Sequence, residues 1–108
     1  MIAPPSRPSP PLRVRNDTCS GRRLAWTVID ESERPTVRFL HTLVSLRRAG
    51  AEVGAVSRVT PGGAPAHWAA SVVLHLPSPG AKTVCALLQD VDPACRASEH
   101  PLLQPGRR

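Results

Sequence analysis

Aromatic residues are scarce in this chain of 108 residues, which has no Tyr, one Phe and two Trp. Domains that recognise single-stranded RNA stack bases on aromatic side chains of their central strands, in a pattern such as K/R-G-F/Y-G/A-F-V, which is absent here. Only Trp26, Phe39 and Trp68 are available, and Phe39 lies in a segment with helical periodicity. The sequence therefore disfavours binding of RNA or DNA, which remains the third hypothesis for function.

Patterns that carry catalysis are also absent, including the P-loop, GxSxG and HExxH. Cys19, Cys85 and Cys95 form no CxxC pair, and an odd number of cysteines without an export signal predicts reduced thiols in the cytoplasm. His67 and His75 lie on one strand about 27 Å apart, too far to share a metal ion. We expect no metal, no cofactor and no enzymatic activity.

The formal net charge of +6 is located at the two ends of the sequence. Residues 24–95 are neutral, with six basic and six acidic side chains. Residues 1–21 are rich in Pro and Arg and predict a disordered basic arm. A folded domain is expected over residues 22–100 and a flexible tail over residues 101–108. No apolar run approaches the roughly 20 residues that span a membrane, so we expect no membrane partner.

Strand and helix signals alternate between Arg23 and Cys95. Two strand–helix units separated by a hairpin are typical of the split βαβ arrangement, so the sequence predicts an α+β fold of the ferredoxin-like βαββαβ sandwich type. A fourth strand is needed after Pro93, and ACRASEH is its candidate. The other segments, in order, are RLAWTVID, ERPTVRFLHTLVSLRRAG, AEVGAVSRVT, HWAASVVLHL and SPGAKTVCALLQDV.

The first predicted helix has clear boundaries and two neighbouring apolar rows. Pro35 suits the first helical position, where its missing amide donor costs nothing. Gly50 supplies the left-handed residue that ends a helix. Together the rows predict a broad buried stripe; they contain Val37, Leu40 and Val44, and Phe39, Leu43 and Leu46.

Short motifs at both ends of this helix carry a resemblance to a known family. Arg34-Pro35-Thr36-Val37 stands at its opening, and Arg48-Ala49-Gly50-Ala51-Glu52-Val53 stands at its close. The later stretch SVVLHLPSPGAKTVCALLQDVD has the form of a strand, a short Ser-Pro turn and a helix. Over residues 22–98 the chain resembles the ACT domain, in particular the small regulatory subunit of acetolactate synthase.

The resemblance implies a non-catalytic subunit that forms a homodimer and activates a larger enzyme, such as acetolactate synthase in branched-chain amino-acid biosynthesis. It also implies a site for a small amino acid at the dimer interface. The second hypothesis is a free-standing sensor or interaction module without a synthase partner. The ligand-binding residues that the resemblance implies are Pro35, Thr36, Val37, Gly50, Ala51, Glu52 and Val53.

Two of these positions depart from the family pattern. Thr36 stands where the family has glycine, and its side chain would crowd an approaching carboxylate. Glu52 stands where the family has a ligand-binding asparagine, and its charge would pair with the ammonium group of an amino acid but repel its carboxylate. The sequence therefore indicates weak or absent binding of valine.

Overall fold

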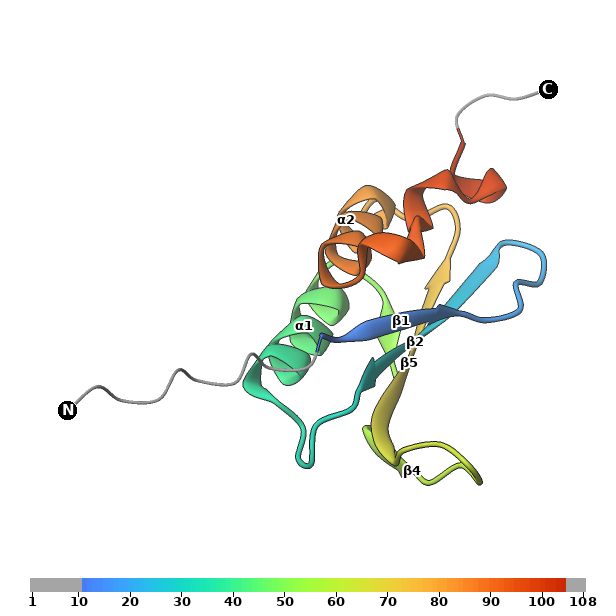
Figure 1. The fold of residues 1–108 in the computed structure, drawn as a ribbon. Helices are drawn as coiled ribbons and strands as arrows, with labels where there is room; N and C mark the ends of the chain where they lie inside the picture. Colours follow the sequence, from blue (N-terminus) through green and yellow to red (C-terminus); the bar gives the residue numbers. More distant parts are fainter. Residues whose placement is uncertain (1–10, 105–108) are drawn as a thin grey trace.

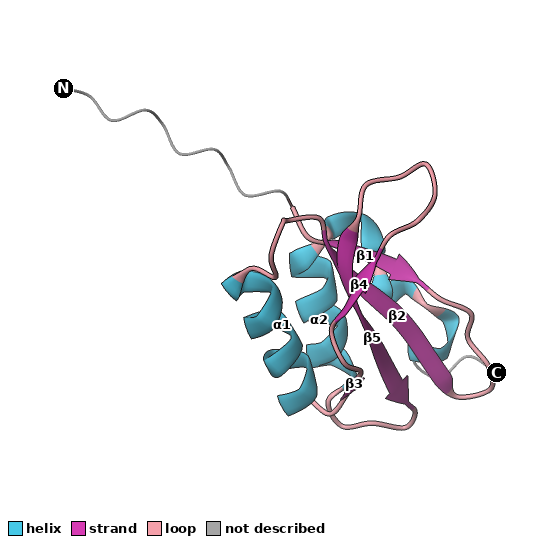
Figure 2. Ribbon diagram, turned by 90° about the horizontal axis from the view of Figure 1, so that it is seen from below, coloured by secondary structure: helices cyan, strands magenta, loops and turns pink. Residues whose placement is uncertain are grey.

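A computed structural model describes residues 11–104, which form one antiparallel sheet and two helices packed on one of its faces (Figures 1 and 2). The predicted α+β class is confirmed. No helix among these residues is both long and apolar enough to cross a membrane. The elements are β1 (Arg13–Asn16), β2 (Arg23–Asp30), α1 (Val37–Arg48), β3 (Glu52–Val53), β4 (Ser57–Val59), β5 (His67–His75) and α2 (Ala81–Val91), followed by the 3₁₀ turns η1 (Pro93–Cys95), η2 (Ala97–Glu99) and η3 (Pro101–Leu103).

The sheet has the order β1-β2-β5-β3, and β4 also pairs with β5. β3 and β4 together occupy the segment that was predicted as one strand. Gly54 lies between them, and its amide donates to the carbonyl oxygen of Ser71 at 2.8 Å. A Cβ atom at Gly54 would lie 2.5 Å from the hydroxyl oxygen of Ser71, so a side chain at this position would require that hydroxyl to move.

The predicted fourth strand after Pro93 is wrong, because the ACRASEH segment forms 3₁₀ turns. Asp92 stops the preceding helix, and its carboxylate accepts a hydrogen bond from the amide of Ala94 at 3.1 Å. Arg96 then has a φ of 49°, in the left-handed region, which an extended strand does not allow. These residues turn the chain back towards the core instead of along the sheet.

The edge of the sheet next to β2 is formed by β1, so the predicted disordered arm is wrong for this part of residues 1–21. Leu12 and Val14 are only 2% and 9% exposed, while Arg13 and Arg15 point outwards. The amide of Val14 also donates to the carboxylate of Asp92 at 2.9 Å, which connects the edge strand to the end of α2. Residues 1–10 of the predicted arm lie outside the described residues.

The predicted flexible tail over residues 101–108 also needs correction. Pro101–Leu103 form η3, and Leu103 packs against the hydrophobic core. The side chain of His100 caps this turn by accepting from the amide of Leu102 at 3.1 Å. The folded domain therefore extends beyond residue 100, and residues 105–108 are not among the described ones.

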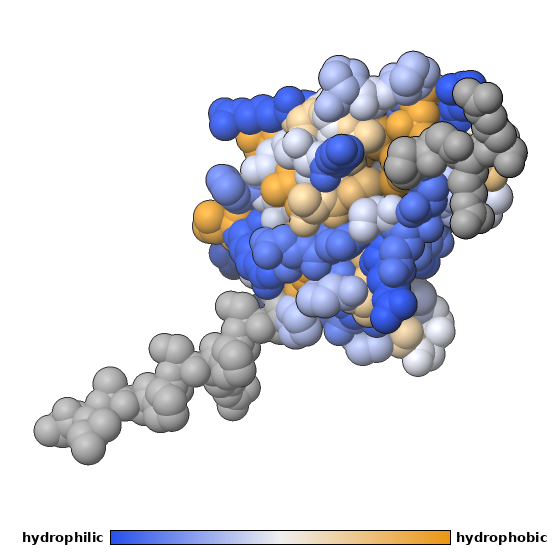
Figure 3. All heavy atoms as spheres, turned by 90° about the horizontal axis from the view of Figure 1, so that it is seen from above, coloured by the Kyte–Doolittle hydropathy of each residue, from blue (hydrophilic) through white to orange (hydrophobic). Residues whose placement is uncertain are grey.

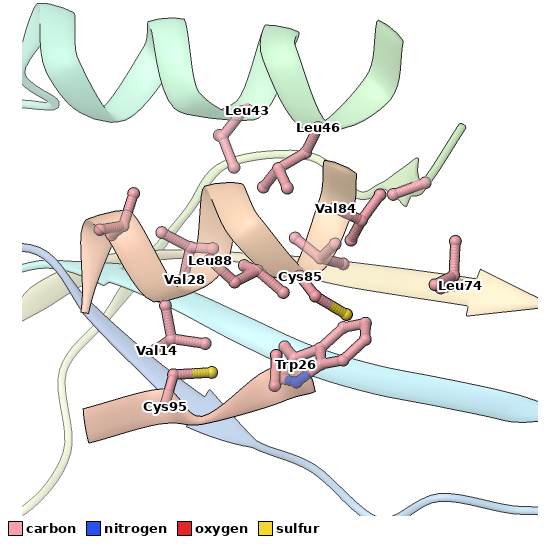
Figure 4. Close-up of a cluster of buried hydrophobic side chains, with 14 of the residues drawn as sticks. Val14, Trp26, Val28, Leu43, Leu46, Leu74, Val84, Cys85, Leu88 and Cys95 are labelled. Carbon is pink, nitrogen blue, oxygen red and sulfur yellow. The ribbon is translucent and has the colours of Figure 1, made fainter. Parts of the chain in front are cut away.

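The core lies between the sheet and the two helices. Alternate residues of the central strands β2 and β5 point into it, as period-two patterning predicts. The helices contribute one row each, and Figure 4 shows Trp26 and Cys85 side by side beneath α2. Side chains with no exposed surface in this layer include Leu24, Val28, Phe39, Leu46, Val72, Leu74, Val84 and Leu88.

The two helices meet where α1 ends and α2 begins. Gly50 has a φ of 107° and ends α1, as predicted, and the amide of Ala51 donates back to the carbonyl oxygen of Leu46 at 3.1 Å. A Cβ atom at Gly80 would lie 1.7 Å from the carbonyl oxygen of Ala49, so any other residue there would force the helices apart. This contact fixes the helix layer over the sheet.

The buried position of Leu12 gives the first testable prediction. Leu12→Ala should lower the free energy of unfolding by about 2–5 kcal/mol, because it removes buried methyl groups and leaves a cavity. Val37→Ala is the control, since Val37 is 84% exposed and should change stability by less than about 0.5 kcal/mol. Urea unfolding measures both. Equal, small effects for the two variants would show that the segment before β1 is not packed on the core.

Candidate functional site

The junction between β2 and α1 is organised around the carboxylate of Asp30, which has no exposed surface. It accepts hydrogen bonds at 2.9 Å from the amide of Ser32, the amide of Thr36 and the hydroxyl of Thr36. Thr36 is in turn the N-cap of α1, because its side-chain oxygen accepts from the amide of Phe39 at 3.1 Å. One side chain from the central strand thus fixes the start of the helix.

The charge of Asp30 is stabilised in this buried position. Burial raises the pKa of its carboxyl group, but the hydrogen bonds from Thr36 and Ser32 outweigh it, so the pKa lies below the ordinary value of 3.8. The carboxylate also benefits from the positive end of the α1 dipole. The chain therefore places a negative charge of its own where an anion would be expected to bind at the start of a helix.

The loop that connects Asp30 to Thr36 is held from its other side by Trp68 and Arg58. The indole nitrogen of Trp68 donates to the carbonyl oxygen of Glu33 at 3.1 Å, and the guanidinium of Arg58 donates to the same oxygen at 3.0 Å. The guanidinium of Arg58 also lies 5.0 Å from the centre of the Trp68 ring, a cation–π arrangement. The loop is therefore held by β4 and β5 as well as by β2.

The structure separates the predicted ligand-binding residues into two groups at opposite ends of α1. Pro35, Thr36 and Val37 lie at its start, where Pro35 and Thr36 are half-buried. Pro35 is not the first helical residue as predicted, because Thr36 is the N-cap and α1 begins at Val37. Gly50, Ala51, Glu52 and Val53 lie at its end. The 12 residues of α1 extend about 18 Å, so one chain does not bring both groups to a single small ligand.

The group at the end of α1 offers one charged side chain to solvent. Ala51 is buried, whereas the side chain of Glu52 is 74% exposed. Its carboxylate lies 3.6 Å from Nε2 of His75 on the neighbouring strand β5. The guanidinium of Arg47 reaches the carbonyl oxygen of Val53 at 3.5 Å. These contacts connect α1, β3 and β5 at this end of the molecule.

The buried thiols pack rather than react. Cys85 and Cys95 are 3% and 4% exposed, and burial is the main cause of the raised pKa of each thiol. Both therefore stay protonated at neutral pH and behave as small apolar groups. In the part of the chain that the structure describes, no three His, Cys, Asp or Glu side chains gather as a metal site.

An exposed apolar row on α1 is the feature that the sequence analysis missed. Val37, Leu40 and Val44 were predicted to be buried, but they are 84%, 44% and 43% exposed. Only the neighbouring row faces the core, where Phe39 has no exposed surface. The spacing i, i+3 and i+7 places the three exposed side chains on one stripe, the form in which a helix docks in an apolar groove.

The chain matches no protein-family model, no curated protein and no solved structure. Its candidate sites therefore stand on their own geometry. Of these, the exposed row on α1 is a surface that a partner could cover, and the helix start beside it is already closed by Asp30.

The lowered pKa of Asp30 predicts how stability depends on pH. The stabilisation is fully present above the pKa of an unfolded Asp, about 3.9, and is lost as pH falls through the lower value in the folded chain. Asp30→Asn should reduce the free energy of unfolding at neutral pH by about 1.5–3 kcal/mol, because charged hydrogen bonds are lost. It should also flatten the acid-dependent fall in stability. Urea unfolding between about pH 7 and pH 2.5 measures both effects.

Asp90→Asn is the control for this experiment, since Asp90 is exposed on α2. It should leave the shape of the pH profile unchanged. The assignment to Asp30 would be refuted if the Asp30→Asn variant lost stability on acidification as steeply as the unmodified chain.

Proposed function

We propose that this chain is a non-catalytic regulatory subunit of the ACT-like kind, which binds a larger biosynthetic enzyme such as acetolactate synthase and stabilises its active form. The observation that carries the proposal is the exposed apolar row Val37, Leu40 and Val44 on α1. Exposed residues at this spacing leave a helix face without a partner, and a larger protein with an apolar groove would cover it.

Charge around the apolar row favours an acidic rim on the partner. Arg47 and Arg48 are exposed in the last turn of α1, where cations suit the negative end of the dipole. Neither side chain forms an ion pair with another residue of the described range 11–104. Val44 and Arg48 are four residues apart and so lie on the same side of the helix. The proposed docking surface thus combines an apolar stripe with a basic end.

The ferredoxin-like sandwich is part of the same proposal, with one change. The order β2, α1, β3/β4, β5 and α2 supports the predicted arrangement, and β1 occupies the edge next to β2 where the fourth strand was expected. β1 and the pair β3/β4 are the two edges of the sheet. A homodimer formed by pairing such edges would build the extended sheet that the resemblance implies.

Regulation of the partner without amino-acid inhibition is the form of the proposal that the geometry favours. Asp30 already holds the amide of Thr36, so an incoming carboxylate would have to compete with a buried internal one. The two predicted ligand-binding groups lie about 18 Å apart on one chain, so only a second copy could complete a joint site. We therefore favour activation of the partner over sensing of a free amino acid as the function of this chain.

Two alternatives remain open. A free-standing sensor or interaction module would use the same α1 row without a synthase partner. Binding of RNA or DNA is less well supported, because Arg13 is paired with Glu31 and Arg15 with Asp17 on the exposed side of β1. Those cations are therefore neutralised within the chain.

The proposal is tested by mixing the purified chain with the purified catalytic subunit of acetolactate synthase from the same source and measuring acetolactate formation. The unmodified chain should raise the rate. Leu40→Glu should abolish the increase, because it places a charge in the middle of the docking row. Thr83→Glu, an exposed substitution of the same kind on α2, should leave it intact.

Circular dichroism and analytical size-exclusion chromatography establish that both variants fold. A catalytic subunit that neither binds the unmodified chain nor gains activity from it would overturn the synthase assignment. Activation that survives Leu40→Glu would overturn the role of the α1 row.

A further inference from the structure

A groove is formed by α2, the turn that precedes it and the C-terminal 3₁₀ turns. Its volume is about 870 Å³, within the range of about 300–1,000 Å³ that is typical of small-molecule sites. Its walls come from three parts of the chain: Arg22 before β2, residues 76–89, and residues 98–104. It shares no lining residue with the docking row on α1.

The lining of the groove carries positive charge. Arg22 and Lys82 both line it, and no Asp or Glu is among its lining residues. The backbone of Arg22 is fixed beside the end of β5, because its carbonyl oxygen accepts a hydrogen bond from the amide of Leu76 at 2.8 Å. Within the range 11–104, neither cation is part of an ion pair. Two cations in one lining that contains no acidic residue favour an anionic group in the groove.

The first turn of α2 is preceded by Ser78, whose hydroxyl accepts a hydrogen bond from the amide of Gly80 at 3.3 Å. Its N-cap is Gly80, which makes no side-chain capping hydrogen bond, and the turn contains no acidic residue. Instead it carries Lys82, whose charge is unfavourable beside the positive end of the helix dipole. An anion bound by Lys82 would offset this unfavourable charge. Departures from the residue preferences of a helix start are expected at functional sites.

The remainder of the groove is largely apolar. Its lining includes the hydrocarbon side chains of Leu76 and Leu103 and the thiol of Cys85. Leu102 at its rim is 42% exposed, one of few large apolar side chains so exposed in the described range. Figure 3 shows hydrophobic residues at the surface among hydrophilic ones on the face seen from above, the side on which α2 and the C-terminal turns lie in Figure 1.

We propose that this groove binds an amphipathic monocarboxylate, whose carboxylate lies between Arg22 and Lys82 and whose hydrocarbon chain lies along Leu76, Cys85 and Leu103. The two cations of the lining match an anionic head group, and the apolar lining residues match a hydrocarbon chain. This site shares no lining residue with the docking row, so it can be tested without the proposed partner.

Octanoate is a suitable probe, and amide NMR of the full chain is a suitable measurement. Octanoate should shift the signals of residues in the first turns of α2 and in η3 in a saturable manner. 1-Octanol, which has the same chain without the charge, should bind at least about tenfold more weakly. Arg22→Gln and Lys82→Gln should each weaken octanoate binding by about tenfold.

Arg48→Gln is the matched control, because it removes an exposed cation from α1 and should leave octanoate binding unchanged. Ala86→Phe fills the groove from an exposed lining position and should abolish binding while the chain stays folded. Equal affinity for octanoate and octanol would overturn recognition of the carboxylate. Absence of binding at millimolar octanoate, or binding that is insensitive to Arg22→Gln, Lys82→Gln and Ala86→Phe, would overturn the site.

Discussion

The buried carboxylate of Asp30 is the interaction on which the arrangement of this small domain depends. It extends from the central strand β2, accepts two hydrogen bonds from Thr36 and one from Ser32, and so determines where α1 begins. A buried charge without these donors would cost several kcal/mol, whereas a charge that accepts three is held in its ionised form. The direction of α1, and therefore which of its rows faces the core, follows from this junction.

That direction has a functional consequence. With Phe39 turned into the core, the row of Val37, Leu40 and Val44 faces solvent, and the basic last turn of α1 lies at one end of that row. The amide of Thr36 already donates to Asp30, so it is not free to bind an external carboxylate. One local arrangement thus supports both parts of the proposed function, which are docking to a larger enzyme and activation without amino-acid inhibition.

Much of the fold could be predicted from local patterns, and particular residues show why the rest could not. The alternation of β5 and the stop at Gly50 depend on neighbouring residues alone, so periodicity and turn chemistry predict them. β1 is only four residues long and follows a proline-rich stretch. The alternation of Val14 with Arg13 and Arg15 was therefore too short to be recognised as a strand pattern. The place of β1 in the sheet depends on β2 and Asp92, which are distant in sequence.

The candidate site was predictable to a similar extent. The end of α1 could be located from Gly50, whereas its start lies two residues after Pro35, where Asp30 and the N-cap Thr36 determine it. The burial of Asp30 could not be predicted, because a carboxylate at the end of a strand is usually solvated. The two apolar rows of α1 also look alike in sequence. Which one is buried depends on how α1 packs on the sheet and against α2, and this packing involves residues that are distant in sequence, such as Gly80 beside Ala49.

The central claim is that the chain's own carboxylate occupies the anion position at the start of α1. Titration of the isotope-labelled full chain with valine at neutral pH, followed by the amide signals of Ser32 and Thr36, tests it most directly. The account predicts that neither signal moves at millimolar valine, because both amides already donate to Asp30. A saturable shift of the Thr36 signal that Asp30→Asn enhances would show that valine competes for this position, and it would contradict the account.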